Sequence, residues 1–288
     1  MNHDRFLAPP GKKVSLKSYD PGYNGSFRSK EDAEEKLKDD IERLARYQGM
    51  LYAQNIYALL IIIQGMDAAG KDSVVKHVMT GVNPQGCQVV GFKQPSPEEL
   101  DHDYLWRCAK ALPARGRIGI FNRSYYEEVL IVRVHPEMLK EERLPPWAER
   151  NTIWNDRFED IRAFERHLVR NGTVILKFFL HVSKEEQKKR FLERLTHPDK
   201  FWKFSPLDVR ERSSWDDYMN AYEDMLRNTS TETAPWYVIP ADHKWFTRVA
   251  VADVIVETLK TLKLDFPKMT REQKKSIESA MKMLKEES

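Results

Sequence analysis

Apolar and polar positions along this chain follow two rhythms. Short, almost continuous apolar runs have the length and composition of strands, and they cover residues 58–64, 88–92, 117–121, 173–181 and 236–240. Elsewhere apolar residues recur at helical spacing, which predicts helices at residues 29–54, from 71 onward, and at 97–111, 125–132, 148–169, 183–195, 213–227 and 244–262. Strands that alternate with helices predict parallel βαβ units, so we expect an α/β fold whose sheet is covered by helices on both faces.

The same pattern divides the chain into three parts. Residues 1–28 are rich in Gly, Pro, Lys and Asp and lack periodicity, which predicts an irregular N-terminal arm. We interpret residues 29–265 as a single domain, whose first helix opens with a capping pattern at Ser29 and Asp32. Residues 266–288 are expected to form a charged C-terminal helix.

Composition then narrows the class of protein. The chain has 288 residues, of which 41% are hydrophobic and 32% are charged, as in a globular domain with a sizeable core. A formal net charge of +3 is too small for a general nucleic-acid binder. Cys87 and Cys108 are the only cysteines and lack CxxC spacing, which argues against a disulfide framework and fits a reducing compartment.

The chain also lacks the signals of export. No apolar stretch of a signal peptide lies at its N-terminus, and the longest strongly apolar run, Tyr57–Ile63, is too short to span a bilayer. We therefore expect a cytoplasmic protein without nucleic-acid or membrane partners.

A glycine-containing loop follows the first apolar run. Ala58–Ile63 leads into Gly-Met-Asp-Ala-Ala-Gly-Lys-Asp at residues 65–72, which nearly matches the Walker A pattern. In such a loop successive N–H groups point at phosphate oxygens, and a lysine in the first turn of the next helix adds positive charge. The expected phosphate-binding residues are Gly65, Met66, Ala68, Ala69, Gly70, Lys71 and Asp72.

Two carboxylates depart from the usual loop. Asp72 stands where Walker A has the Ser or Thr that binds magnesium, and Asp67 lies inside the loop. Because carboxylates repel a bare polyanion, both suit a site in which a divalent metal lies between them and the phosphates. The alternative is structural: Asp72 complements the helix N-terminus, and Asp67 is a turn residue.

A second polar cluster follows the strand predicted at residues 117–121. Ligands in open parallel sheets bind beyond the carboxyl ends of the strands, so Asn122 and Arg123 are expected to face the phosphate loop. A fixed guanidinium stabilises the charge on a phosphoryl group in transfer, so we predict that Arg123 is catalytic together with Asp67 and Lys71.

The same segment holds candidates for acceptor binding. Asn122, Glu127 and Arg133 are expected to contact the acceptor nucleotide. The alternatives are a carboxylate at a helix start for Glu127 and a surface ion pair for Arg133.

Aromatic residues and cations interleave within residues 196–215, between two predicted helices, as in a lid that closes over a site. The residues expected to hold a long anion are Lys200, Lys203, Arg210 and Arg212. An ordinary solvated surface is the alternative for each cation, because acidic residues are mixed among them.

Three motifs together resemble a known family. The octapeptide at residues 65–72, Phe-Asn-Arg-Ser-Tyr-Tyr-Glu at residues 121–127 and Ala-Pro-Trp-Tyr at residues 234–237 are similar to the polyphosphate kinase 2 family. The resemblance spans about residues 30–265. Residues 125–135 resemble the class III members, which phosphorylate both AMP and ADP.

The resemblance implies a fold, an activity and partners. It implies a thymidylate-kinase-like P-loop core with a helical lid, and reversible transfer of the terminal phosphoryl group of inorganic polyphosphate to AMP or ADP. The implied metal is Mg²⁺, with Mn²⁺ as the alternative, and the implied assembly is a homo-oligomer, either a dimer or a tetramer. By motif, Asp67 and Asp72 handle the metal and the acceptor phosphate, Lys71 and Arg123 neutralise the phosphoryl group, and the lid cations guide the polymer.

Two other functions share most of this pattern. The first is an ATP-dependent kinase of a nucleoside monophosphate or another small molecule, against which Asp72 counts. The second is a regulatory module that binds a nucleotide without transferring a phosphoryl group.

Overall fold

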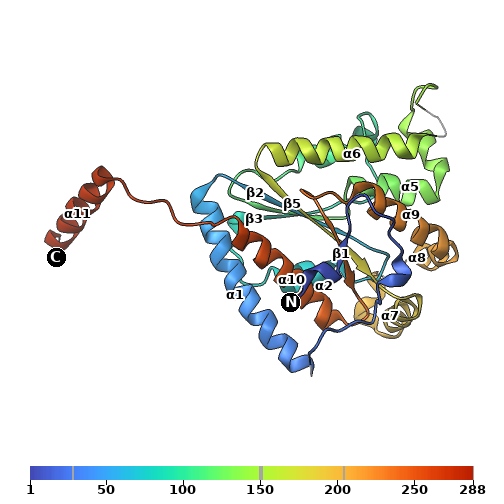
Figure 1. Cartoon of the computed structure of the whole chain (residues 1–288), viewed down its shortest axis with the longest axis horizontal. Helices are drawn as coiled ribbons and strands as arrows, with labels where there is room; N and C mark the ends of the chain where they lie inside the picture. The colour runs from blue at the N-terminus through green and yellow to red at the C-terminus, as the bar shows by residue number, and fades with distance from the viewer. Residues whose placement is uncertain (28, 149–151, 204, 288) are drawn as a thin grey trace.

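A six-stranded sheet forms the centre of the computed structural model, which describes residues 1–27, 29–148, 152–203 and 205–287 (Figure 1). The strands are β1 (Leu7–Ala8), β2 (Ala58–Gln64), β3 (Cys87–Gly91), β4 (Ile118–Asn122), β5 (Thr173–His181) and β6 (Trp236–Pro240). Their order is β1-β6-β5-β2-β4-β3. All neighbours are parallel except β1, which pairs antiparallel with β6.

Strand β2 lies inside the sheet because its side chains are apolar on both faces. All seven of its residues are buried, and it pairs with β4 on one side and β5 on the other. Ile63, near the end of β2, pairs with Asn122 at the end of β4. This register brings the loops that follow the two strands to the same edge of the sheet.

Helices cover both faces of the sheet, as the sequence predicts (Figure 1). They are α1 (Lys30–Gln54), α2 (Lys71–Val78), α3 (Pro97–Leu100), α4 (Trp106–Lys110), α5 (Ile131–Val134), α6 (Ile153–Arg170), α7 (Lys184–Thr196), α8 (Pro206–Glu211), α9 (Trp215–Thr229), α10 (Lys244–Thr261) and α11 (Arg271–Glu286). Short 3-10 helices are η1 (His3–Arg5), η2 (Leu16–Ser18), η3 (Pro84–Gly86), η4 (Tyr125–Val129), η5 (Pro136–Glu142), η6 (Pro198–Lys203) and η7 (Arg212–Ser214).

Helices α10, α2 and α1 lie on one face, and α6 and α9 lie on the other (Figure 1). Helix α10 is buried along most of its length because α1 packs over it. Helix α1 begins where its capping pattern predicts, since the Ser29 hydroxyl accepts the Asp32 N–H. None of the described helices combines the length and the apolar character needed to cross a membrane.

The structure differs from the sequence predictions in several places, and one of them is the helix expected at residues 125–132, which is the 3-10 helix η4 followed by α5. The N-terminal arm is less irregular than expected, because Leu7 and Ala8 extend the sheet and Phe6 is buried in the core. The helix expected at residues 97–111 is two short helices, α3 and α4. The prediction at residues 148–169 includes residues 149–151, which lie outside the described residues, and the helix begins at Ile153.

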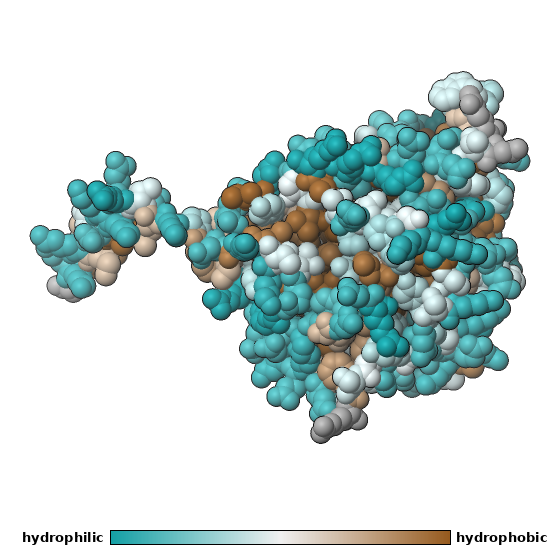
Figure 2. All heavy atoms as spheres, viewed as in Figure 1, coloured by the Kyte–Doolittle hydropathy of each residue, from teal (hydrophilic) through white to brown (hydrophobic). Residues whose placement is uncertain are grey.

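Helix α11 stands apart from the rest of the chain at the end of an extended segment (Figure 1). Its apolar residues Ile277, Met281 and Leu284 are exposed. The view of Figure 2 shows hydrophilic residues over most of the surface, with apolar residues gathered near the middle of the main body.

Candidate active site

The loop between β2 and α2 has the backbone path of a phosphate cradle. Gly70 caps α2 with a φ of 108°, and Ala68 has a φ of 62°, so the chain turns sharply twice. A Cβ at Gly65 would lie 2.9 Å from the carbonyl oxygen of Leu180 on β5. Only glycine fits there, because the loop must pass close to the neighbouring strand before it enters the helix.

Lys71 carries its charge inside this loop. Its side chain is 8% exposed, and Nζ donates hydrogen bonds to the carbonyl oxygens of Gly65 at 2.6 Å and Met66 at 3.2 Å. Burial, together with the nearby charge of Arg123, lowers the pKa of Lys71 to about 8. Because a buried ammonium with carbonyl partners is held in one position, Lys71 is preorganised for phosphate oxygens.

The two loop carboxylates each face a polar group from the end of β4. Asp67 Oδ1 lies 2.6 Å from Arg123 Nη2, and Asp72 Oδ1 accepts a hydrogen bond of 2.7 Å from Asn122 Nδ2. The predicted cluster of Asp67, Asp72, Asn122 and Arg123 is therefore assembled. Its members come from the two loops that the strand register brings together.

The donor chemistry of this cluster fits a divalent metal that is shared with phosphates. Among the described residues, no three His, Cys, Asp or Glu side chains form a protein cage for a metal. Magnesium is usually held by one or two carboxylates together with substrate phosphates, rather than by such a cage. Asp67 and Asp72 supply carboxylate oxygens of that kind beside the phosphate loop.

Arg123 is held in an unusual backbone conformation between two acids. Its φ is 65°, in the left-handed region, and its N–H donates to the Ile63 carbonyl at 3.0 Å. Its guanidinium contacts Asp67 and, at 3.2 Å, Glu127, whose other oxygen accepts a hydrogen bond from Gln64. Glu127 and Asp67 raise the pKa of Arg123, against the effect of burial. The guanidinium is thus fully charged and aimed across the mouth of the loop.

Side chains of helix α7 donate hydrogen bonds to the carbonyl oxygens of the phosphate loop, a contact that the sequence did not predict. Arg190 is 3% exposed and donates to the carbonyl oxygens of Ala68 at 2.9 Å and Ala69 at 3.0 Å. Gln187 Nε2 donates to the Asp67 carbonyl at 2.9 Å. Arg190 has the spacing of a surface pair with Glu186, and that pair does form, at 2.9 Å. The available signal was the position of Gln187 and Arg190 on the same helical face as the buried Phe191.

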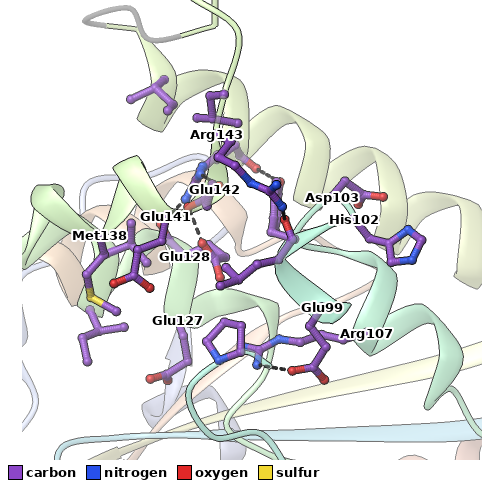
Figure 3. Close-up of a pocket in the computed structure, with 18 of the residues that line it drawn as sticks. Glu99, His102, Asp103, Arg107, Glu127, Glu128, Met138, Glu141, Glu142 and Arg143 are labelled. Atoms are coloured by element: carbon purple, nitrogen blue, oxygen red, sulfur yellow. Dashed lines mark hydrogen bonds and ion pairs between the residues drawn. The ribbon is translucent and has the colours of Figure 1, made fainter. Parts of the chain in front are cut away.

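A cavity of about 1300 Å³ opens beside the loop (Figure 3). It is lined by the loop after β3, the region from Glu99 to Arg107, the η4 and η5 region and the first turns of α6. Arg123 and Glu127 belong to its wall, so the cavity and the phosphate loop share one boundary. Figure 3 shows the carboxylates of Glu127, Glu128 and Glu141 on one side of the cavity.

A buried ion-pair network supports the cavity wall. Arg157 of α6 donates to Glu128 Oε2 at 2.9 Å and to Glu142 Oε2 at 2.5 Å, and thus joins η4 to η5. Burial raises the pKa of Glu128 to about 7, although Arg157 opposes this effect. Arg107 donates to the carbonyl of Lys93 at 2.8 Å and holds the loop after β3. These contacts connect segments that are far apart in the sequence around one space.

The remaining predicted residues lie farther from the loop. Arg133 on α5 is ion-paired with Asp224 on α9 and is not part of the cavity wall. This is the paired arginine that the sequence left as the alternative, and a nucleotide contact of Arg133 stays a prediction.

The predicted lid contains η6, α8 and η7. Arg210 is exposed, whereas Arg212 donates to Gln187 Oε1 at 2.6 Å and to the Lys184 carbonyl at 3.0 Å. The side chains of Lys200 and Lys203 lie outside the described residues. Burial and then the charge of Asp67 raise the pKa of Asp208 on α8, so this helix lies within electrostatic reach of the phosphate loop.

The fold and the site together define a P-loop phosphotransferase. The parallel strand order places the Walker A loop and the Arg123 turn on one sheet edge, beside a cavity with room for a small molecule.

Comparisons with known proteins identify the family. The model of the polyphosphate kinase 2 family matches residues 27–267. The ADP-polyphosphate phosphotransferase of Rhodopseudomonas palustris is 52% identical over 274 residues, which are 95% of this chain and 95% of that protein. The AMP/ADP-polyphosphate phosphotransferase of Meiothermus ruber is 44% identical over 264 residues, 91% of this chain and 95% of that protein. The chain belongs to the polyphosphate kinase 2 family.

A solved structure agrees with this assignment. The crystal structure of polyphosphate kinase 2 from Arthrobacter aurescens TC1 superposes with a TM-score of 0.86 at 40% identity. The superposition covers 98% of each chain. The predicted family resemblance and the predicted P-loop fold are thus confirmed.

Proposed function

We propose that this chain is an enzyme that transfers the terminal phosphoryl group of inorganic polyphosphate to AMP and ADP, reversibly, with magnesium as its metal. The names of its relatives support this activity, because one is an ADP-polyphosphate and another an AMP/ADP-polyphosphate phosphotransferase. The use of AMP as well as ADP follows the second relative and the class III resemblance of residues 125–135.

One structural observation carries the proposal. Arg123 and Glu127 lie both in the polar cluster at the phosphate loop and in the wall of the cavity. A nucleotide in the cavity would therefore direct its terminal phosphate toward Arg123, next to the loop that holds the donor phosphates. This arrangement aligns donor and acceptor for direct transfer, which requires no protein nucleophile.

In the proposed transfer, the terminal P–O–P bond of the polymer breaks as an oxygen of the nucleotide phosphate bonds to phosphorus. The shortened polyphosphate leaves with the electron pair of the broken bond. Lys71 neutralises oxygens of the donor, and Arg123 stabilises charge on the phosphoryl group in transit. Asp67 and Asp72 would hold a magnesium ion, which would supply further charge neutralisation when bound.

The lid provides a path for the polymer in this proposal. Arg210, Arg212, Lys200 and Lys203 would guide the polyanion toward the loop. Arg210 is exposed and therefore open to such a contact, while Arg212 would act through its attachment to α7. Closure of the lid would exclude water from the phosphoryl group.

The test is product formation by the purified full chain. Magnesium, long-chain polyphosphate and either AMP or ADP are supplied, and ADP and ATP are measured against a control with ATP and AMP but no polymer. Product only with the polymer supports the proposal. Product only in the control would instead identify an ordinary nucleotide kinase, and silence in both would favour a binding module.

Two variants and a matched control locate the site. Lys71→Ala and Asp67→Asn are expected to abolish transfer while circular dichroism stays unchanged, whereas Lys76→Ala, on the exposed side of the same helix, should be fully active. Removal of divalent ions with a chelator should stop the reaction, and added Mg²⁺ or Mn²⁺ should restore it.

We further propose a cytoplasmic homo-oligomer, a dimer or tetramer. Measurement of the mass in solution tests the number of subunits.

A further inference from the structure

A cluster of charged and hydroxyl groups lies in the core behind the catalytic segment. Glu165 of α6 and Lys177 of β5 form an ion pair with 2.6 Å between Oε2 and Nζ. The hydroxyls of Tyr125 and Tyr126 donate to Glu165 Oε1 at 2.9 and 2.7 Å. All four side chains are buried, and the two tyrosines belong to the segment that carries Arg123.

The polar atoms of this cluster are fully satisfied. Lys177 donates its three protons to Glu165, to the Tyr126 hydroxyl at 3.0 Å and to the Thr229 carbonyl at 2.8 Å. The Tyr126 hydroxyl accepts a hydrogen bond from Lys177 and donates one to Glu165, so its donor and its acceptor are both used. The cluster joins η4, α6, β5 and the end of α9 through a single set of bonds.

Stability alone is a poor explanation for such a cluster. Replacing a buried ion pair with apolar residues of similar volume is often neutral or stabilising, because desolvation of the charges offsets their attraction. A fully bonded buried pair does specify geometry, however, since any displacement leaves a charged group without a partner. The segment whose geometry it specifies is the one between Arg123 and Glu127.

The backbone connects the cluster directly to Arg123. The Tyr126 N–H donates to the Ser124 hydroxyl at 3.2 Å, and the Glu127 N–H donates to the Ser124 carbonyl at 3.1 Å. Arg123 precedes this turn in a left-handed conformation, which is strained for a residue with a side chain. Anchored hydroxyls just after the strained residue oppose its relaxation to an ordinary conformation.

We propose that Glu165 and Lys177 are positioning residues for phosphoryl transfer, which act through the hydroxyls of Tyr125 and Tyr126 to hold Arg123 in its left-handed turn. The inference rests on the function proposed for Arg123 and extends the site into the core. None of the four side chains touches the substrate.

Tyr-to-Phe variants of the full chain test the idea, because each removes one oxygen and keeps the packing. With magnesium, polyphosphate and ADP, Tyr126→Phe should lower kcat about 10-fold and leave the KM for ADP within about twofold, since a displaced catalytic group slows the chemical step. Tyr125→Phe should lower kcat less, because Glu165 Oε1 keeps the hydroxyl of Tyr126. Tyr19→Phe is the matched control: it removes a hydroxyl that donates to the Leu7 carbonyl at 2.9 Å, and kcat should not change.

A double variant separates positioning from general loosening of the core. In the Arg123→Lys background, Tyr126→Phe should lower kcat by less than about twofold, because the group that it positions is already lost. Independent, multiplicative losses would overturn the proposal, as would full kcat in both Tyr-to-Phe variants. If Tyr126→Phe does not fold, the same cycle with Tyr125→Phe decides. Full kcat in Arg123→Lys alone would refute the function of Arg123 itself, while the polymer-dependent activity would stand.

Discussion

The ammonium of Lys71 has two competing surroundings. Burial disfavours its charge and brings its pKa to about 8, while the loop carbonyls of Gly65 and Met66 accept its protons. A bound phosphate would favour the charged form, since opposite charges at close range stabilise each other. Lys71 therefore titrates near pH 8 only when the loop holds no anion.

This titration predicts a pH dependence. Lys71 of the free enzyme is charged below pH 8 and loses its charge above it, so kcat/KM should fall as the pH rises through about 8. The kcat should stay level over the same range, because it reports the substrate-bound enzyme. Lys71→Arg should remove the decline in kcat/KM, since a guanidinium stays protonated. A wild-type kcat/KM that is flat up to about pH 9.5 would contradict this assignment.

At the scale of elements, helix α7 stabilises the phosphate loop. Arg190 Nη2 also donates to the carbonyl oxygens of Ala241 at 2.6 Å and Asp242 at 3.0 Å, so one guanidinium joins the loop after β6 to the phosphate loop. The guanidinium of Arg190 uses donors on three separate nitrogens to reach four carbonyl oxygens and Glu186, whereas a lysine has three donors on a single nitrogen.

Arg190→Lys is therefore expected to weaken the loop. The kcat/KM should fall about 10-fold to 100-fold, because small displacements of a phosphate site are costly. Lys189→Ala changes the exposed neighbour on the same helix and should leave kcat/KM unchanged. Steady-state kinetics measure both variants, and equal behaviour of the two would mean that Arg190 does not organise the loop.

A buried acid connects helices α1 and α10. Asp253 is 2% exposed and accepts hydrogen bonds from Lys36 at 2.6 Å and from His3 at 2.7 Å. Burial by itself raises the pKa of Asp253, but the bonds from His3 and Lys36 outweigh it and hold that pKa well below its ordinary value. The carboxylate therefore stabilises the fold when it is ionised.

Asp253→Asn should lower the free energy of unfolding by about 3 kcal/mol at neutral pH, because it removes the carboxylate that Lys36, His3 and the N-terminal ammonium share and leaves Asp40 as the counter-charge of Lys36. A depressed pKa stabilises the protein above the unfolded value near 4, and this contribution disappears as the pH falls below that value. The difference in Tm between wild type and variant should therefore shrink below about pH 4. Asp39→Asn, at an exposed position of α1, is the control, and a Tm difference independent of pH would contradict the prediction.

At the scale of the whole molecule, the parallel strands bring the site residues to one edge of the sheet, whereas α11 lies apart from the sheet and its covering helices (Figure 1). No described residue from 265 to 287 is buried, although Ile277, Met281 and Leu284 form an apolar stripe on α11. The single chain thus gains no core from this helix.

Truncation after Pro267 should leave the Tm within about 2 °C of the full chain, because exposed residues contribute little to folding. Thermal unfolding followed by circular dichroism measures this. A fall of several degrees would mean that α11 packs on a surface outside the single chain, and the mass in solution would then be expected to change as well.

Several features of the chain were predictable because they depend on neighbouring residues. The apolar run of β2, the glycines at residues 65 and 70 and the cap at Ser29 each act over a few positions, and all lie where the pattern predicts. The family resemblance has the same origin, since its motifs are short and contiguous. The proximity of the phosphate loop to Asn122 and Arg123 was also predictable, because ligands of open parallel sheets bind beyond the carboxyl ends of the strands.

Other features required the tertiary structure. Nothing local in residues 1–28 indicates that β1 pairs with β6, because a two-residue strand has no periodicity. Arg190 has the spacing of a surface ion pair, and only the packing of α7 against the loop buries it. By itself, the sequence determined the class of fold, the phosphate loop and the chemistry of its side chains, which are local properties. Only the tertiary structure decided which carbonyls, carboxylates and hydroxyls hold those side chains in place, because such contacts join residues that are distant along the chain.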